Sequence, residues 1–147
     1  MGVEGIFSVT QLICSGLSSF CMASGFTVLT GCTRNYSKSM NVLLSSLMHT
    51  NPDVECKVYC FGWEKSLIDS FRNEHDVDFC YVSVTDQVKL DVRENVRSGE
   101  ALKLKVKCIN DFLFERSSAA LWIDADSLVS GNLEGVSSKI VTQGFDI

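Results

Sequence analysis

Two aspartates one residue apart, Asp124 and Asp126, are the residues of this chain whose type and spacing most clearly indicate chemistry. They follow a short apolar run at residues 119–123, and the chain becomes apolar again at Leu128 and Val129. Carboxylates this close together repel each other, and burying either one unpaired is costly. A hard divalent cation removes both problems, because Mg²⁺ and Mn²⁺ take oxygen ligands and are commonly held by carboxylates together with substrate phosphates. We therefore predict a site for Mn²⁺ or Mg²⁺ with Asp124 and Asp126 as its ligands.

The elements that hold these aspartates alternate between strand and helix along the chain. Short runs rich in β-branched and aromatic residues predict strands at residues 26–33, 56–61, 77–84 and 119–123. Apolar residues at helical spacing predict helices after the first and second strands, and a third helix from Glu100 to about Arg116. This alternation predicts an α/β fold, a three-layer αβα arrangement around a mainly parallel sheet.

The predicted helices each have one apolar face. The first is expected to begin with Ser37 as its cap and to end before Pro52. Its buried stripe is expected to consist of Met40, Leu43, Leu44, Leu47 and Met48. In the third predicted helix, the inward stripe is expected to consist of Leu102, Val106, Ile109 and Leu113. Ligands of parallel sheets bind at the carboxyl ends of the strands, so we expect the site to combine residues 33–37 with the aspartates.

The composition indicates a single globular domain and argues against some kinds of partner. The chain has 147 residues, 46% of them apolar, and a formal net charge of −5, whereas nucleic-acid binding needs a basic face. Its seven cysteines form no Cys-x-x-Cys pair, so we expect small buried thiols in a reducing compartment rather than zinc ligands. We therefore expect no nucleic-acid partner and a cytoplasmic location, with the secretory pathway or Golgi as the alternative.

The stretch from Ile6 to Leu29 carries no charge but does not have the pattern of a membrane anchor. Gln11 and several serines interrupt it, and Glu4 precedes it without any basic residue. We therefore expect no membrane partner, and we interpret residues 1–25 as a leader or an additional helix that precedes the domain at 26–147.

Three segments together resemble a known family of enzymes. They are Val-Leu-Thr-Gly-Cys-Thr at 28–33, Lys-Val-Tyr-Cys-Phe-Gly at 57–62, and Leu-Trp-Ile-Asp-Ala-Asp-Ser-Leu-Val at 121–129, which a lysine-bearing helix precedes. In this order they resemble the donor-binding half of nucleotide-sugar-dependent glycosyltransferases of the type-A fold. The glycogenin-like and galactosyltransferase-like retaining enzymes, of the family 8 kind, are the nearest in pattern, and the resemblance extends over about residues 26–140.

The resemblance implies a Rossmann-like fold of the nucleotide-diphospho-sugar transferase type and a nucleotide-diphosphate sugar, preferably a UDP-sugar, as the donor. Asp124 and Asp126 would match the metal-binding pair of the family, with the metal bridging them to the donor diphosphate. Ala125, which lies between them, would be a further donor-binding residue. The loop from Thr30 to Tyr36 would match the wall that holds the nucleotide base. Its expected binding residues are Thr30, Cys32, Thr33 and the stacking candidate Tyr36. A lysine of the preceding helix, Lys105 or else Lys103, would reach the donor.

Enzymes of this family have a second half that supplies the acceptor site, further catalytic groups and often a metal-binding histidine. Because only residues 127–147 follow Asp126, we expect the domain at 26–147 to be incomplete at its C-terminal end and to be inactive in sugar transfer alone. The sequence identifies no catalytic residue, sugar or acceptor.

Two other functions fit the same aspartates. The first motif of haloacid-dehalogenase-type phosphatases also places Asp-x-Asp after an apolar strand, with the first aspartate, here Asp124, as nucleophile. That motif normally opens its domain, however, whereas here several predicted elements precede it. The remaining alternative is a non-catalytic module, which is either a remnant that still binds a nucleotide sugar or a structural α/β domain. In a structural domain, Asp124 and Asp126 would be a helix cap and a turn residue.

Overall fold

A computed structural model describes residues 26–84, 99–116 and 118–136 of the chain. The expected leader at 1–25, most of the connection at 85–99 and a further strand expected at 140–142 lie outside the described residues. The side chains of Glu100 and Ala101 are not described either.

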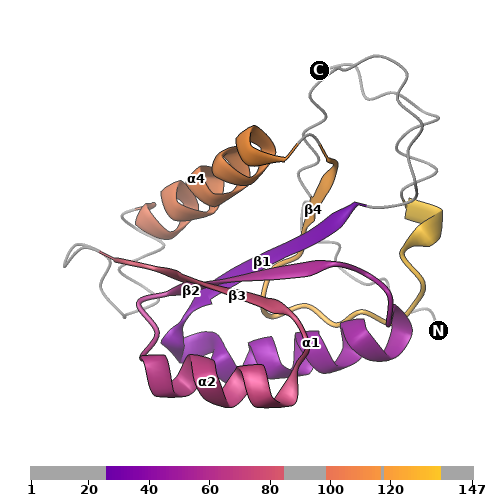
Figure 1. The fold of residues 1–147 in the computed structure, drawn as a ribbon, viewed down its shortest axis with the longest axis horizontal. Helices are drawn as coiled ribbons and strands as arrows, with labels where there is room; N and C mark the ends of the chain where they lie inside the picture. Colours follow the sequence, from indigo (N-terminus) through magenta and orange to yellow (C-terminus); the bar gives the residue numbers. More distant parts are fainter. Residues whose placement is uncertain (1–25, 85–98, 117, 137–147) are drawn as a thin grey trace, which may run out of the picture.

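The described residues form a parallel four-stranded sheet with the strand order β3-β2-β1-β4 (Figure 1). The strands are β1 (Thr27–Thr33), β2 (Cys56–Phe61), β3 (Asp78–Val82) and β4 (Ala120–Trp122). All three pairs of neighbouring strands are parallel, which confirms the α/β fold and parallel sheet predicted from the alternating pattern. Every residue of β1 other than Gly31 is buried, because strands lie on both of its sides and helices cover both of its faces.

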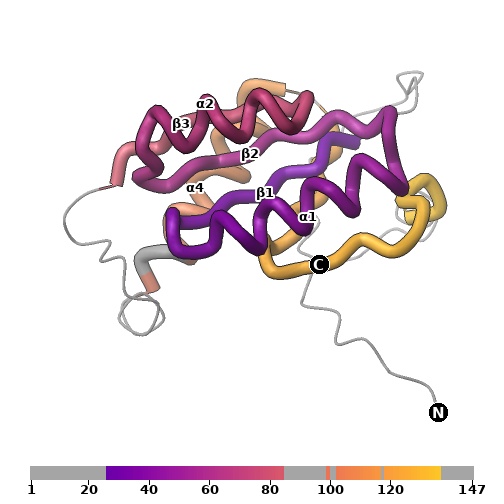
Figure 2. Tube along the Cα trace, turned by 90° about the horizontal axis from the view of Figure 1, so that it is seen from below, coloured from indigo at the N-terminus to yellow at the C-terminus, as the bar shows by residue number. Residues whose placement is uncertain are grey.

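Helices cover the sheet on both faces, so the described part has three layers (Figures 1 and 2). A short 3₁₀ helix, η1 (Arg34–Tyr36), leads into α1 (Ser37–Thr50), and α2 (Lys65–Glu74) lies beside α1. The third helix, α4 (Glu100–Glu115), packs on the opposite face with its buried residues against β1, β2 and β4. This layout confirms the expected αβα layers and is compatible with a Rossmann-like arrangement.

Helix α1 is held by the stripe that its sequence predicts. Met40, Leu43, Leu44 and Leu47 are fully buried against the sheet, and full burial of such a side chain contributes about 1.5–3 kcal/mol. The prediction that Ser37 caps this helix was wrong, because η1 continues directly into α1 and Ser37 already has helical backbone angles. The residue before the helix is Tyr36, whose side chain makes no capping hydrogen bond.

Thr30 is a polar residue in the middle of the buried strand β1. Its side chain is fully buried, and among the described residues its hydroxyl oxygen has no hydrogen-bond partner. An unpaired buried hydroxyl costs free energy, whereas a methyl group in the same place does not. We predict that Thr30→Val raises the free energy of unfolding by about 1 kcal/mol in urea denaturation.

Thr27 supplies the matched control for this prediction. It is also buried in β1, but its hydroxyl donates a 3.2 Å hydrogen bond to Oε2 of Glu55. Thr27→Val removes that bond and should lower the free energy of unfolding by about 1 kcal/mol. If both variants change stability in the same direction, burial of an unpaired hydroxyl is not what distinguishes Thr30.

The chain after β4 runs back along α1. Hydrogen bonds to one side chain of that helix and to the residue directly after it hold this segment in place. The backbone N–H of Val129 donates to Oγ of Ser46 at 3.1 Å. The buried amide of Asn51 accepts from the N–H of Leu133 at 2.7 Å and donates to the carbonyl of Gly131 at 3.1 Å. This attachment holds the segment that follows the aspartates against the α1 face of the sheet.

We predict that Asn51→Ala lowers the free energy of unfolding by about 2 kcal/mol, because it removes both hydrogen bonds to the backbone of residues 131–133. Thermal unfolding followed by circular dichroism would measure the loss. Asn110→Ala is the matched control, since Asn110 is exposed on α4 and alanine favours a helix. An Asn51 variant as stable as the Asn110 variant would show that these bonds do not hold the segment in place.

Candidate functional site

The order of the strands places a reversal of the sheet between β1 and β4. From β1 the chain moves outward through β2 to β3, and it then returns over the other face through α4 to add β4 on the far side of β1. In open α/β sheets, ligands bind beyond the carboxyl ends of the strands at such a reversal. The sequence predicts that the segments after β1 and after β4 form the site. Because β1 and β4 are neighbours, these two segments begin at adjacent strands.

Asp124 lies two residues past the end of β4. Pairing with β1 ends where Trp122 faces Leu29, and the N–H of Ile123 donates to the carbonyl of Leu29 at 2.9 Å. A turn follows at once, closed by a 3.0 Å hydrogen bond from the N–H of Ser127 to the carbonyl of Asp124. The short strand and the turn thus fix the backbone of Asp124 beside the carboxyl-terminal half of β1.

One carboxylate oxygen of Asp124 accepts hydrogen bonds from two side chains. Nζ of Lys105 and Nε1 of Trp122 each lie 2.9 Å from Oδ1. The Lys105 side chain is only 19% exposed and that of Asp124 35% exposed, so this ion pair is better shielded from water than a typical surface pair. Asp124 therefore has a defined orientation before any ligand arrives.

Lys105 reaches Asp124 because α4 presents a different face to the sheet from the predicted one. Of the four expected inward residues, Ile109 is buried and Leu113 is partly buried against the same core. The prediction was wrong for Leu102 and Val106, which are 61% and 43% exposed. The residues that face the sheet, at helical spacing, are Lys105, Cys108, Ile109 and Phe112. A lysine can occupy such a position because its apolar stem covers other side chains while its ammonium group finds a partner.

The other two lysines of this helix do not share that position. Lys107 is exposed and pairs with Asp111 one turn further along α4, and Lys103 is exposed as well. Of the two lysines that the resemblance suggests for the donor, the structure brings Lys105 to Asp124. That Lys105 also contacts a donor stays a prediction.

Ala125 and Asp126 differ from Asp124 in how far they are buried. Ala125 is buried in the core beneath α1 and α2, and Asp126 is exposed. Among the described residues, no three His, Cys, Asp or Glu side chains gather into a metal-binding group. Two carboxylates at one turn nevertheless fit Mg²⁺ or Mn²⁺ bound in part by substrate phosphates, because such sites need only one or two protein carboxylates.

The residues predicted for the base-binding wall lie largely inside the protein. Thr30, Cys32 and Thr33 are buried, and Tyr36 is half-buried against the core beneath α1 and α2. Burial raises the pKa of the Cys32 thiol to about 12, with a smaller contribution from the neighbouring Cys60. Cys32 is thus a neutral core residue, and its carbonyl accepts a 2.8 Å hydrogen bond from Nε1 of Trp63.

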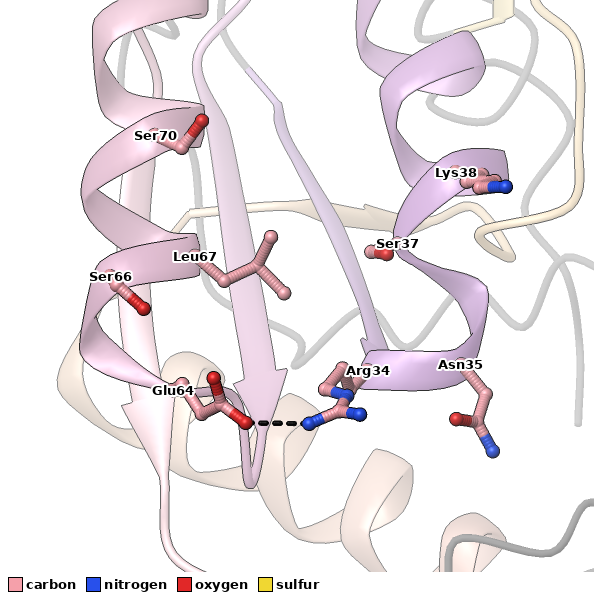
Figure 3. A pocket seen from close by; sticks show the side chains of 8 residues that line it. All are labelled: Arg34, Asn35, Ser37, Lys38, Glu64, Ser66, Leu67 and Ser70. Carbon is pink, nitrogen blue, oxygen red and sulfur yellow. Dashed lines mark hydrogen bonds and ion pairs between the residues drawn. The ribbon is translucent and has the colours of Figure 1, made fainter.

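The exposed residues at this end of β1 are Arg34 and Asn35. They lie within the loop expected at the site but are not among its predicted binding residues. They border an open depression of about 650 Å³ (Figure 3). Its other lining residues are Ser37, Lys38, Glu64, Ser66, Leu67 and Ser70. Arg34 and Glu64 form an ion pair across it, linking the segment after β1 to the segment after β2. The change from a buried strand to polar residues directly after Thr33 was the sequence signal for these side chains.

No helix among the described residues combines the length and the apolar character needed to span a bilayer. No protein-family model matches the chain, and no curated protein matches it either. The arrangement of Asp124 with Lys105 and Trp122 at the reversal of the sheet is therefore the feature that indicates a function.

Proposed function

We propose that this chain binds a nucleotide-diphosphate sugar, preferably a UDP-sugar, through a divalent cation held by Asp124 and Asp126. It would act as the donor-binding half of a glycosyltransferase of the type-A fold. The observation that carries this proposal is the position of Asp124, past β4 at the reversal of the sheet, paired at 2.9 Å with Lys105. Helix, lysine, strand and Asp-x-Asp occur together in the order on which the resemblance rests.

Three side chains would contribute in different ways to holding the diphosphate. Asp124 and Asp126 supply carboxylate oxygens, and Lys105 orients Asp124 while adding a positive charge next to it. When bound, Mn²⁺ or Mg²⁺ would supply a Lewis acid that neutralises the departing diphosphate. In the complete reaction, an acceptor hydroxyl oxygen would bond to the anomeric carbon and lose its proton, while the bond from that carbon to the diphosphate breaks and UDP leaves.

The segment after β1 would contact the nucleotide from the neighbouring strand. Arg34 and Asn35 are exposed there, whereas the side chains of Thr30, Cys32 and Thr33 are buried. We therefore propose that any contact of those three residues with the nucleotide is made through the backbone. Tyr36 remains the candidate for stacking on the base, with its ring half-buried at the start of α1.

Calorimetry with UDP in the presence and absence of Mn²⁺ tests this proposal. We predict Mn²⁺-dependent binding of UDP by the unmodified chain and a loss of affinity of at least about 100-fold in Asp124→Ala, because the carboxylate is a ligand of the cation. Asp53→Ala is the matched control, since Asp53 is exposed in the turn after α1. Binding that survives in Asp124→Ala would contradict the proposal.

A phosphatase assay on the same protein, together with the UDP titration, distinguishes the proposed function from the other two. Hydrolysis of p-nitrophenyl phosphate without any binding of UDP would replace the proposal by the phosphatase. Neither binding nor hydrolysis would leave a non-catalytic α/β domain.

A further inference from the structure

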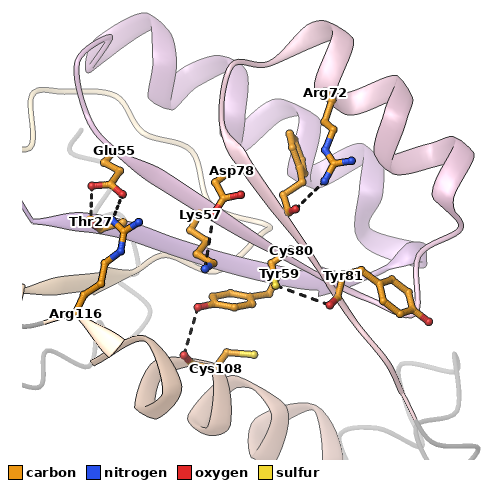
Figure 4. Close-up of polar contacts among 11 residues, drawn as sticks. Thr27, Glu55, Lys57, Tyr59, Arg72, Asp78, Cys80, Tyr81, Cys108 and Arg116 are labelled. Carbon is orange, nitrogen blue, oxygen red and sulfur yellow. Dashed lines mark hydrogen bonds and ion pairs between the residues drawn. The ribbon is translucent and has the colours of Figure 1, made fainter. Parts of the chain in front are cut away.

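The carboxylate of Asp124 belongs to a closed ring of contacts that connects α4, β4 and β2. Lys105 of α4 bonds to Asp124, and Asp124 accepts from the indole N–H of Trp122 at the end of β4. The indole stacks on Tyr59 of β2, with ring centroids 6.3 Å apart and planes 13° from parallel. The hydroxyl of Tyr59 donates at 3.4 Å to the carbonyl of Cys108, a hydrogen bond that Figure 4 shows. Cys108 lies one turn beyond Lys105 on α4, which closes the ring.

The side chain of Trp122 contacts three other members of this ring, namely Tyr59, Lys105 and Asp124. One face of its ring system is covered by Tyr59, and Nζ of Lys105 lies 5.3 Å from its ring centroid. The side chain is buried, which leaves the indole little freedom to rotate. Its N–H is thereby aimed at Oδ1 of Asp124, and the charge on that oxygen makes the bond stronger than one between neutral groups.

A purely apolar role for Trp122 would not need this hydrogen bond. Phe and Leu fill buried positions without a polar atom, whereas a buried indole N–H must find a partner. Here the partner is the carboxylate that the proposed function assigns to the cation, two residues further along the chain. The two donors hold one oxygen of the carboxylate and so fix the plane of the whole group.

We propose that Trp122 is a positioning residue of the donor site, which sets the orientation of Asp124 through its indole N–H. Because the indole packs against Tyr59, the orientation of Asp124 also depends on the positions of Tyr59 and α4. This inference rests on the proposed function. Partners that orient a metal-binding side chain commonly change metal affinity by about 10- to 100-fold when they are removed. Trp122 therefore belongs to the binding site, although it is buried.

The chain offers a matched control, because it has one other tryptophan. Trp63 is buried too, and its indole N–H donates a 2.8 Å hydrogen bond to the carbonyl of Cys32. Trp122→Phe and Trp63→Phe each remove one buried indole hydrogen bond and leave an aromatic ring in place. Both variants should therefore lose stability, while Trp122→Phe alone removes a donor to Asp124.

Calorimetry with UDP and Mn²⁺ compares the two variants with the unmodified chain, and thermal unfolding measures their stability. We expect Trp122→Phe to bind about tenfold more weakly and Trp63→Phe to bind as the unmodified chain does. A second measurement needs no variant. In ¹⁵N nuclear magnetic resonance spectra of the unmodified chain, adding Mg²⁺ and UDP should shift the indole N–H resonance of Trp122 and leave that of Trp63 in place.

The outcomes separate this inference from the proposed function. If UDP and the cation bind, but Trp122→Phe is no weaker than Trp63→Phe and the Trp122 resonance does not move, the positioning role is overturned while the proposed function stands. If the unmodified chain binds neither UDP nor the cation, both are overturned. Should Trp122→Phe fail to fold, the indole resonance of the unmodified chain decides: a shift on adding Mg²⁺ and UDP supports the positioning role, and binding without a shift overturns it.

Discussion

Replacing Lys105 with methionine is expected to weaken the Mn²⁺-dependent binding of UDP by about 100-fold. Methionine keeps an unbranched stem that can lie over Trp122, but it removes the ammonium group that donates to Oδ1 of Asp124 at 2.9 Å. The site then loses a positive charge beside two carboxylates and a diphosphate. Titration calorimetry with UDP and Mn²⁺ measures the effect directly.

Lys107→Met is the matched control for this variant. Lys107 lies on the same helix two residues further on, but it is exposed and pairs with Asp111 of α4 itself, and an exposed ion pair of this kind contributes little to stability. We expect its binding to be unchanged. If Lys105→Met lowers thermal stability but not affinity, the ion pair with Asp124 is a structural contact and Lys105 plays no part in binding.

Replacing Gly31 with valine is expected to lower the free energy of unfolding by about 3 kcal/mol, the largest stability effect that we predict for a single residue. A Cβ atom at this position would lie 2.8 Å from the carbonyl oxygen of Tyr59 and 3.1 Å from Cζ of Phe61. Tyr59 is the partner of Gly31 in the parallel pairing of β1 and β2. The two central strands would have to separate to admit a side chain.

Urea denaturation of Gly31→Val measures this loss, and Gly131→Ala provides the control. A Cβ atom on Gly131 would meet no atom within 4 Å, so that variant should stay within about 0.5 kcal/mol of the unmodified chain. A stable Gly31→Val protein would show that Tyr59 is less closely packed on β1 than the structure indicates. Because Tyr59 stacks on Trp122, such a result would also mean that this tyrosine holds the indole less firmly.

The layers of the fold were predictable because the sequence carries two clear periods. The stripe of α1 repeats at helical spacing, and the runs that became β1 and β2 are rich in β-branched, aromatic and other apolar residues, which favour strands. The position of β4 was not predictable in this way. A parallel strand can be added beside β3 or beside β1, and only the structure shows that β4 pairs with β1.

Part of the inward face of α4 was predicted wrongly because the prediction treated every lysine of the helix as a surface residue. Two stripes fit the same helix, one through Leu102 and Val106 and the other through Lys105 and Cys108. Ile109 belongs to both. The second stripe faces the sheet, since the ammonium group of Lys105 meets Asp124 and its stem lies over Trp122. A lysine on an otherwise apolar face was the available signal.

The aspartates could be selected from sequence, but their surroundings could not. Nothing in the spacing of Trp122 and Asp124 shows that the indole N–H points at the carboxylate, because that contact depends on side-chain rotamers and on the turn after β4. The predicted residues of the segment after β1 illustrate the same limit. Thr30, Cys32 and Thr33 are buried because β1 is a central strand with helices on both faces of the sheet, and no local pattern encodes that packing.

The most direct test of the account is the location of Mn²⁺ in a crystal of the chain grown with Mn²⁺ and UDP, identified by its anomalous scattering. The account predicts a peak at ligand distance, about 2.0–2.2 Å, from a carboxylate oxygen of Asp124, with the UDP diphosphate on its other side. A peak bound only to other carboxylates, or ordered UDP without Mn²⁺ at Asp124, would contradict the metal site on which the proposed function depends.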